Sequence, residues 1–248
     1  MRFEDLGSQD GRKLPRRRIN GIGVQKRLPE FVHLDPDIRA DLRPRSASRR
    51  GKDIFLFGQC DQAQSHLANR GVSVGDLFLF FGLFQEAEDD SECLRFVRGA
   101  HKKHILWGWL EVGEDHDLQC KTPRPDLAAV THHPHLQYIG RKNNHVYRAS
   151  KQLSFSPYLA GAGIFERYND ALCLSRLGQP LCSQWALPKF LRQTKASFLH
   201  LEAWQAEAEF IVGRAPGRGQ EFVMDTAGVE TQVERWLKSL FKHAKGVQ

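Results

Sequence analysis

The sequence predicts an α+β protein built on a central, mostly antiparallel sheet with a few flanking helices. Two long apolar runs, LFLFFGLF at 77–84 and HILWGWLEV at 104–112, have the length and composition of central strands. An amphipathic segment at 229–246 predicts a C-terminal helix. The remaining apolar segments follow no regular alternation of strand and helix, and this argues against a doubly wound parallel sheet.

The regular part of the chain begins after residue 53. Residues 54–57 predict a short strand, and residues 61–71 predict a helix that Asp61 caps and Gly71 ends. The strand at 77–84 follows. Because its apolar residues are continuous rather than alternating, we expect both of its faces to be covered.

The second long run is expected to pair with the first as an antiparallel neighbour. Simple alternation along it places Trp107 and Trp109 on one face, and Leu106 and Gly108 on the other. Gly82 and Gly108 leave room beside them for another backbone, a ring or a ligand. We therefore take Trp107 and Trp109 as candidate substrate contacts.

Shorter strand-like segments follow at 94–97, after an acidic loop, and at 145–150, 152–155 and 171–175. Residues 196–210 are rich in helix formers, although the first half could equally be extended. In the C-terminal helix the apolar residues recur at helical spacing and form one stripe. These residues are Val229, Val233, Trp236, Leu237, Leu240 and Phe241.

The charge of the chain is uneven. Its 248 residues carry a net charge of +7, and residues 1–52 hold 14 Lys and Arg against 7 Asp and Glu, which accounts for the whole excess. We predict a basic, poorly ordered arm over residues 1–30 and a single domain over residues 31–248. The arm could neutralise nucleic-acid phosphates, or it could be a solvated tail. The predicted nucleic-acid contacts are Arg16, Arg17, Arg18, Arg49 and Arg50.

The cysteines and the hydropathy of the sequence indicate in which cellular compartment the protein is expected. Five scattered cysteines without a CxxC pair predict reduced thiols rather than disulfides or metal ligands. No stretch approaches the roughly 20 apolar residues that cross a membrane. The first residues are followed by no apolar core of the kind that a secretory signal has. We therefore expect a cytoplasmic protein without a membrane partner.

The segment FVHLDPDIR carries the first candidate site. His33, Asp35 and Asp37 alternate, and an imidazole beside two carboxylates could act as an acid–base pair or bind a divalent cation. Alternatively, Asp35 caps a short helix that Pro36 begins, with Asp37 near the positive end of its dipole.

The segment THHPHLQY carries the second candidate site. If it is extended, His133 and His135 point to the same side and could transfer a proton or hold a metal together. The alternative is a pair of histidines that only make hydrogen bonds. Because no third and fourth ligand is evident, the sequence identifies no metal site.

Polar residues beside strongly apolar neighbours form the third group, since such residues are either satisfied there or used there. His200 lies close to Glu202, and Gln220 precedes Glu221. A glutamine can read an adenine edge, and a glutamate can accept a hydrogen bond from a cytosine amino group. We predict Glu221 as a catalytic residue, and His200 and Gln220 as substrate contacts.

Several familiar chemistries are disfavoured by missing motifs. The sequence contains no GxxxxGK[ST] and no HExxH. The GRAPGRG segment at 213–219 is not the strand-to-helix GxGxxG of a dinucleotide-binding fold. A P-loop hydrolase and a zincin are therefore not indicated.

A series of blocks in order provides a more specific indication. They are LPEFVHLDPDIR, GQCDQAQSHLANRGVSVGDLFLFFGLF, HILWGWLEVGE, HHPH, NNHVYRASKQL, AGAGIF, the Trp-x-Leu-Pro at 185–188, and GQEFVMD. Together they resemble the nucleotide modification associated domain 3 family of bacteria and phages. The likeness extends from about Leu28 to the C-terminal helix, whereas the first 23 residues differ from the usual start of the family. The polar residues that match its blocks are His33, Asp35, Asp37, Asp76, His133, His135, Gln220 and Glu221.

The resemblance implies a role with systems that hypermodify DNA bases. We interpret the chain as a protein that acts on or with modified nucleotides or DNA bases, with DNA or a nucleotide and other base-modification proteins as partners. The three polar groups would line one cleft, with Asp76 and the two tryptophans among the substrate contacts. The alternatives are a non-catalytic module that reads modified nucleic acid, and a truncated, inactive copy. The sequence identifies no cofactor.

Overall fold

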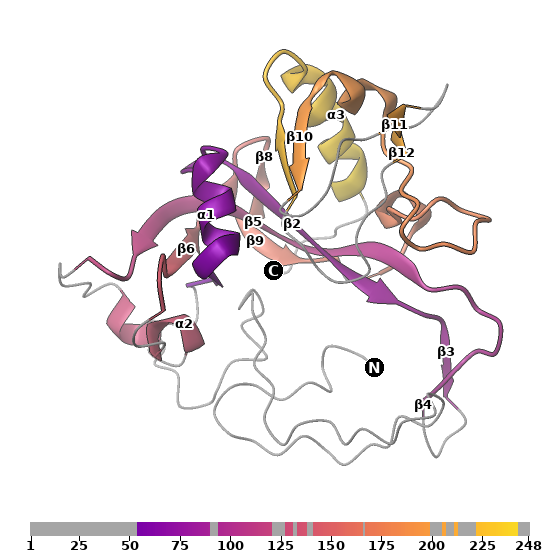
Figure 1. Cartoon of the computed structure of the whole chain (residues 1–248), viewed down its shortest axis with the longest axis horizontal. Coiled ribbons are helices and arrows are strands. Elements are labelled where there is room, and N and C mark those ends of the chain that lie inside the picture. Colours follow the sequence, from indigo (N-terminus) through magenta and orange to yellow (C-terminus); the bar gives the residue numbers. More distant parts are fainter. Residues whose placement is uncertain are drawn as a thin grey trace.

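The computed structural model describes residues 54–89, 94–120, 127–130, 133–137, 141–165, 167–198, 205–206, 211–212 and 222–242. Its main element is a five-stranded antiparallel sheet in the order β1–β6–β5–β2, with β9 also paired to β5 (Figure 1). The strands are β1 (Leu56–Gln59), β2 (Leu77–Phe84), β5 (Lys103–Asp117), β6 (His145–Ala149) and β9 (Ala162–Ile164). The predicted α+β class with a mostly antiparallel sheet is confirmed.

The expected pairing of the two long apolar runs is also confirmed. β2 and β5 are antiparallel neighbours, from Leu77 opposite Glu111 to Phe84 opposite Lys103. β5 is longer than predicted, because beyond β2 it continues along β6 as far as Asp117. One strand therefore connects the two ends of the sheet, as Figure 1 shows.

The predicted faces of the two tryptophans are wrong, because β5 contains a β-bulge. The register against β2 shifts between Phe80 and Phe81, and Trp107 is the extra residue. Since a bulge interrupts simple alternation, Trp107 stacks on Phe80 on one face, with ring centroids 5.6 Å apart. Trp109 packs together with Leu106 in a core on the other face.

The expectation that β2 is covered on both faces is met in part, since Leu77, Leu79 and Phe81 pack against one hydrophobic core, and Phe78 and Phe80 against another. Each residue of β2 keeps some exposed surface, and Leu83 is 47% exposed. Among the described strands β2 lies at an edge of the sheet. A continuous apolar run is therefore compatible here with an incompletely covered edge strand.

In the described part of the chain, three helices flank the sheet: α1 (Asp61–Asn69), α2 (Pro134–Gln137) and α3 (Glu230–Phe241). α3 confirms the predicted C-terminal helix and buries Leu237, Leu240 and Phe241. α1 ends as predicted, with Gly71 at a φ of 74°. Its start differs, because Cys60 is the N-cap residue and Asp61 is the first helical residue.

Two of the shorter segments gain strand partners. β4 (Leu94–Phe96) pairs with β3 (Ala87–Asp89), so part of the predicted acidic loop is a strand. β7 (Gln152–Leu153) pairs with β8 (Ser156–Ala160). The segment predicted as a strand at 171–175 begins instead in a 3-10 turn, η5 (Asp170–Leu172), and reaches β5 only through an isolated bridge.

Of the two alternatives for the first half of 196–210, the described residues support the extended one. β10 (Lys195–Phe198) pairs with β13 (Phe222–Asp225), and β11 (Gln205–Ala206) pairs with β12 (Ile211–Val212). Long-range pairing outweighs the helix propensity of this segment. The other described elements are two 3-10 turns, η4 (Leu127–Val130) and η6 (Lys189–Gln193). No helix among the described residues is long and apolar enough to cross a membrane.

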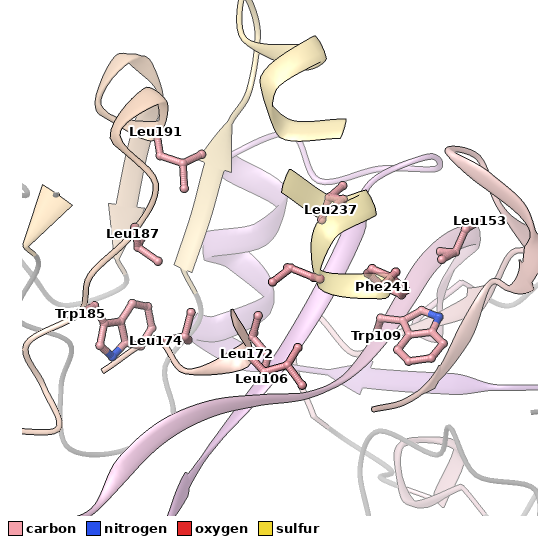
Figure 2. Close-up of a cluster of buried hydrophobic side chains, with 11 residues drawn as sticks. Leu106, Trp109, Leu153, Leu172, Leu174, Trp185, Leu187, Leu191, Leu237 and Phe241 are labelled. Atoms are coloured by element: carbon pink, nitrogen blue, oxygen red, sulfur yellow. The ribbon is translucent and has the colours of Figure 1, made fainter. Parts of the chain in front are cut away.

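The largest core lies between the sheet and α3 (Figure 2). Trp109 from β5 and Phe241 from α3 meet there, with ring centroids 4.8 Å apart. A second core on the opposite face contains Leu67 of α1 and Tyr147 of β6, and a third contains Leu56 and Val146. Figure 1 shows that α1 and α2 lie at the β6 end of the sheet, away from α3.

His104 is a buried histidine of the largest core region, 2% exposed. The Trp185 indole N–H donates to its Nδ1 at 2.8 Å. Burial lowers the pKa of His104 below its usual value. Because the unfolded chain then binds a proton more readily, this group should make the folded state less stable as the pH falls below about 6.5.

We expect His104→Gln to reduce the loss of stability between pH 7.5 and pH 5.5. The reason is that glutamine can accept the Trp185 hydrogen bond without becoming charged. The contribution removed is at most about 1.4 kcal/mol per pH unit. Urea unfolding at the two pH values measures it, and the exposed His101→Gln is the control. Equal pH dependence in the wild type and in His104→Gln would contradict the assignment.

Candidate functional site

The two histidines of the second candidate segment meet beside β1. His133 is completely buried and His135 is 7% exposed, and their ring centroids lie 5.7 Å apart. The segment is a single helical turn, α2, rather than extended, with Pro134 at its first position. The predicted proximity of the two side chains is therefore found in a different backbone conformation.

Gly58 of β1 makes room for this histidine pair. A Cβ atom at residue 58 would overlap Cδ2 and Cγ of His135, and it would lie 2.9 Å from Cε1 of His133. Both imidazoles therefore press directly against the backbone of the strand. A glycine inside a strand is a sequence signal for such a close approach.

Asn144 holds the His135 ring in one orientation. Its Nδ2 donates to the His135 carbonyl oxygen at 2.8 Å, and its Oδ1 lies 2.7 Å from His135 Nδ1. Because the amide oxygen faces the ring, Nδ1 must be the donor, and in the neutral imidazole Nε2 is then the acceptor nitrogen. Asn144 is 3% exposed, so this contact is buried.

A second histidine group lies on the opposite face of the same strands. His145, the first residue of β6, places Nδ1 2.8 Å from Asp115 Oδ1 and Nε2 4.0 Å from Asp117 Oδ1. His145 is 21% exposed, and Asp115 is 29% exposed. This imidazole is therefore both ion-paired and accessible to water.

Tyr147 forms the floor beneath His145, two residues further along the same face of β6. Its ring centroid lies 6.4 Å from that of His145. Its hydroxyl donates to Gln64 Oε1 at 3.0 Å and accepts from Gln64 Nε2 at 2.8 Å. Burial raises the pKa of Tyr147 to about 12, so the phenol keeps its proton. The floor is neutral and attaches α1 to the sheet.

Polar contacts continue from His145 and Asp117 across three neighbouring segments. Asp117 accepts from the Gln119 backbone N–H at 2.9 Å, and Gln119 Oε1 accepts from the Asn143 backbone N–H at 3.1 Å. Asn143 Nδ2 donates to Ser65 of α1 at 2.7 Å. Asp61 pairs with Arg141 at 3.0 Å. We call this set the polar network: Asp61, Ser65, Asp115, Asp117, Gln119, Arg141, Asn143 and His145.

The polar network has chemistry suited to proton transfer and to recognition of a polar ring. A carboxylate that accepts from Nδ1 orients an imidazole and leaves Nε2 to take up a proton. Carboxylates and amides also provide the acceptors and donors that pair with the edges of nucleobases. Among the described residues, no group of three or more His, Cys, Asp and Glu is placed to hold a metal ion.

Our sequence analysis missed His145 and its two aspartates. The available signal was the DHD segment at the end of β5 and the NNH segment at the start of β6, which become opposite each other only when the strands pair. Tyr147 faces Asp115 and His145 faces Asp117 in that register. A sequence reading without the register could not bring them together.

Asp76 and Trp109 were predicted as substrate contacts, and in the structure both make hydrogen bonds within the fold. Asp76 accepts from the Ser73 backbone N–H at 2.8 Å in the exposed turn before β2. Trp109 is 4% exposed, and its Nε1 donates to the Ala160 carbonyl oxygen at 3.0 Å. Trp107 is partly exposed beside Phe80.

The remaining predicted site residues lie outside the described residues, and the expectation of one shared cleft stays a prediction. They are His33, Asp35, Asp37, His200, Gln220 and Glu221, together with Arg16, Arg17, Arg18, Arg49 and Arg50.

Comparison with known proteins provides one match. The family model described as nucleotide modification associated domain 3 matches residues 1–225. No curated protein and no solved structure matches the chain. The match begins earlier than we expected, because it includes the first residues, and it ends before α3. The chain belongs to the nucleotide modification associated domain 3 family.

Proposed function

We propose that this protein acts on or with modified nucleotides or DNA bases, and that the polar network at the β6 end of the sheet is its functional site. Family membership supports the nucleotide context. The observation that carries the choice of site is the pair of Asp115 and His145, which is hydrogen-bonded at 2.8 Å and still partly exposed. Such a pair can take a proton from a reacting group.

In the enzymatic form of the proposal, His145 transfers the proton and Asp115 orients its ring. Asn143 and Gln119 provide amide groups near it, which suit the edge of a base. The histidine pair takes part in proton transfer or supports the site from the opposite face, and the remaining acids position an amine or the base. The predicted catalytic residues retained in this proposal are His33, Asp35, Asp37, His133, His135 and Glu221.

The second candidate function is a reader of modified nucleic acid that performs no chemistry. It is favoured by one observation, the burial of His133 and His135, whose rings have little or no exposed surface. In this form the basic N-terminal residues bind phosphates, and DNA affinity decreases steeply as salt is raised. Other base-modification proteins are the proposed partners in either form.

Nucleoside mass spectrometry on DNA from the native host tests the proposal. Deletion of the gene should remove an unusual nucleoside, and the wild-type gene should restore it. His145→Gln should restore less than a tenth of it, because loss of a general acid or base typically reduces a rate by about 10²–10⁴-fold. The matched control is His101→Gln, which changes an exposed histidine at the other end of β5.

The outcomes separate the two functions. Full restoration by a folded His145→Gln would contradict the choice of site. Persistence of the nucleoside after deletion would contradict the enzymatic form and favour the reader. Absence of an unusual nucleoside from both strains would contradict the link to modified bases.

A further inference from the structure

Asn144 occupies the junction between the two histidine groups. Its side chain makes two hydrogen bonds to His135 on α2, one to the ring and one to the backbone carbonyl. Its own carbonyl oxygen accepts from the Leu118 backbone N–H at 2.8 Å. One buried residue therefore connects α2, the end of β5 and the start of β6.

We propose that Asn144 is the positioning residue of the candidate site, holding His145 against Asp115 and Asp117 through its buried contact with His135. The inference rests on the proposed function, in which His145 is the group that transfers a proton. Asn144 itself lies 3% exposed and touches the site only through the chain.

The connectivity provides the physical reason. His145 directly follows Asn144 in the chain. Asp117 directly precedes Leu118, whose backbone N–H bonds to Asn144. Both members of the His145–Asp117 ion pair are therefore adjacent to residues that Asn144 holds. A hydrogen bond of 2.8 Å weakens steeply when its geometry is disturbed. In a buried environment its loss also leaves a polar group without compensation. The anchor therefore restricts how far His145 can move relative to the aspartates.

The same argument identifies the hydrogen bond between Asn144 Oδ1 and His135 Nδ1 as a contact that holds His145 in place. The Asn144 amide needs a donor at His135 Nδ1, and phenylalanine at position 135 would remove that donor while retaining a ring of similar shape and the backbone carbonyl. We therefore expect His135→Phe to remove one of the two side-chain hydrogen bonds, and Asn144→Ala to remove both. The effect on His145 should be larger for Asn144→Ala.

The titration of His145 in the full-length chain tests the proposal without any substrate. The imidazole Cε1–H signals are followed by NMR from pH 5 to pH 8.5, and the His145 signal is assigned from its loss in His145→Gln. Asn144→Ala should shift the midpoint of the His145 titration by at least about half a pH unit, a threefold change in proton affinity. His135→Phe should shift it in the same direction by less.

Asn169→Ala is the matched control. Asn169 also bonds the backbone through its side chain, because its Oδ1 accepts from the Ala171 N–H at 3.0 Å. It caps η5 beside α3 and lies away from the histidine groups. Its replacement should decrease stability without moving the His145 midpoint. Circular dichroism checks folding, and His135→Phe carries the test if Asn144→Ala does not fold.

An unchanged His145 midpoint in a folded Asn144→Ala or His135→Phe protein would overturn the inference. That result would leave the proposed function intact, because it concerns only how His145 is held. Conversely, a shifted midpoint together with full restoration of the nucleoside by His145→Gln would overturn the choice of site and leave Asn144 as an anchor of the sheet end.

Discussion

Replacement of Trp109 by alanine is expected to lower the free energy of unfolding by about 3–5 kcal/mol, as for other buried aromatic residues. The indole packs against Phe165 and Phe241, with ring centroids 5.0 Å and 4.8 Å away. Its N–H donates to the Ala160 carbonyl oxygen, which would lose this partner. Such a loss is a large part of the 5–15 kcal/mol that stabilises a typical domain.

Gly163 shows how closely the Trp109 side chain is packed. A Cβ atom at residue 163 would lie 2.5 Å from Cζ2 of the indole, so the ring lies directly on the backbone of β9. The WGWLEVGE and AGAGIF blocks therefore meet in the structure. Their juxtaposition explains the Trp and Gly residues by packing, without a ligand.

Urea unfolding followed by circular dichroism measures the effect, with Trp107→Ala as the matched control. Trp107 is partly exposed, so by area burial we expect it to contribute less than Trp109. A change below about 1 kcal/mol in Trp109→Ala, accompanied by loss of nucleotide binding, would contradict the structural role and favour the substrate contact that the sequence suggested.

Replacement of Gly58 by alanine is expected to lower the free energy of unfolding by about 1–3 kcal/mol, the usual range for adding a methyl group to a filled interior. The added Cβ would overlap the His135 ring and crowd His133. Since β1 is paired to β6 along its whole length, the histidines rather than the strand should move. The same substitution should therefore disturb the Asn144 contact.

Denaturant unfolding measures the change in the free energy of unfolding, and the NMR signals of His133 and His135 report whether their rings move. Gly178→Ala is the control, because nothing lies within 4 Å of its Cβ position and only its φ of 76° opposes alanine. It should destabilise the protein without shifting the signals of His133 and His135. If Gly58→Ala shifted neither the stability nor these signals, the close packing against β1 would be contradicted.

Local patterns were sufficient for part of the fold. The apolar stripe of α3 and the two long apolar strands depend on residues a few positions apart, and these elements are found where the sequence predicted them. The proximity of His133 and His135 is local in the same sense, since only Pro134 separates them. For the first half of 196–210 the sequence left helix and strand open, because its strand partner, β13, is distant in the chain.

The candidate site depends on contacts that are not local. His145 meets Asp115 across 30 positions, and Gly58 admits His135 across a much longer separation. The faces of β5 also depend on a bulge that exists only in relation to β2. No periodicity along one strand contains the register of its neighbour.

By itself, the sequence determined the α+β class, the central antiparallel pair, the C-terminal helix and the family, because neighbouring residues and ordered blocks carry that information. Only the tertiary structure decided that Trp109 belongs to the core, that His145 is paired with Asp115 and still partly exposed, and that Asn144 connects it to the histidine pair. The physical reason is that burial and ion pairing depend on strand register, which many distant residues set together.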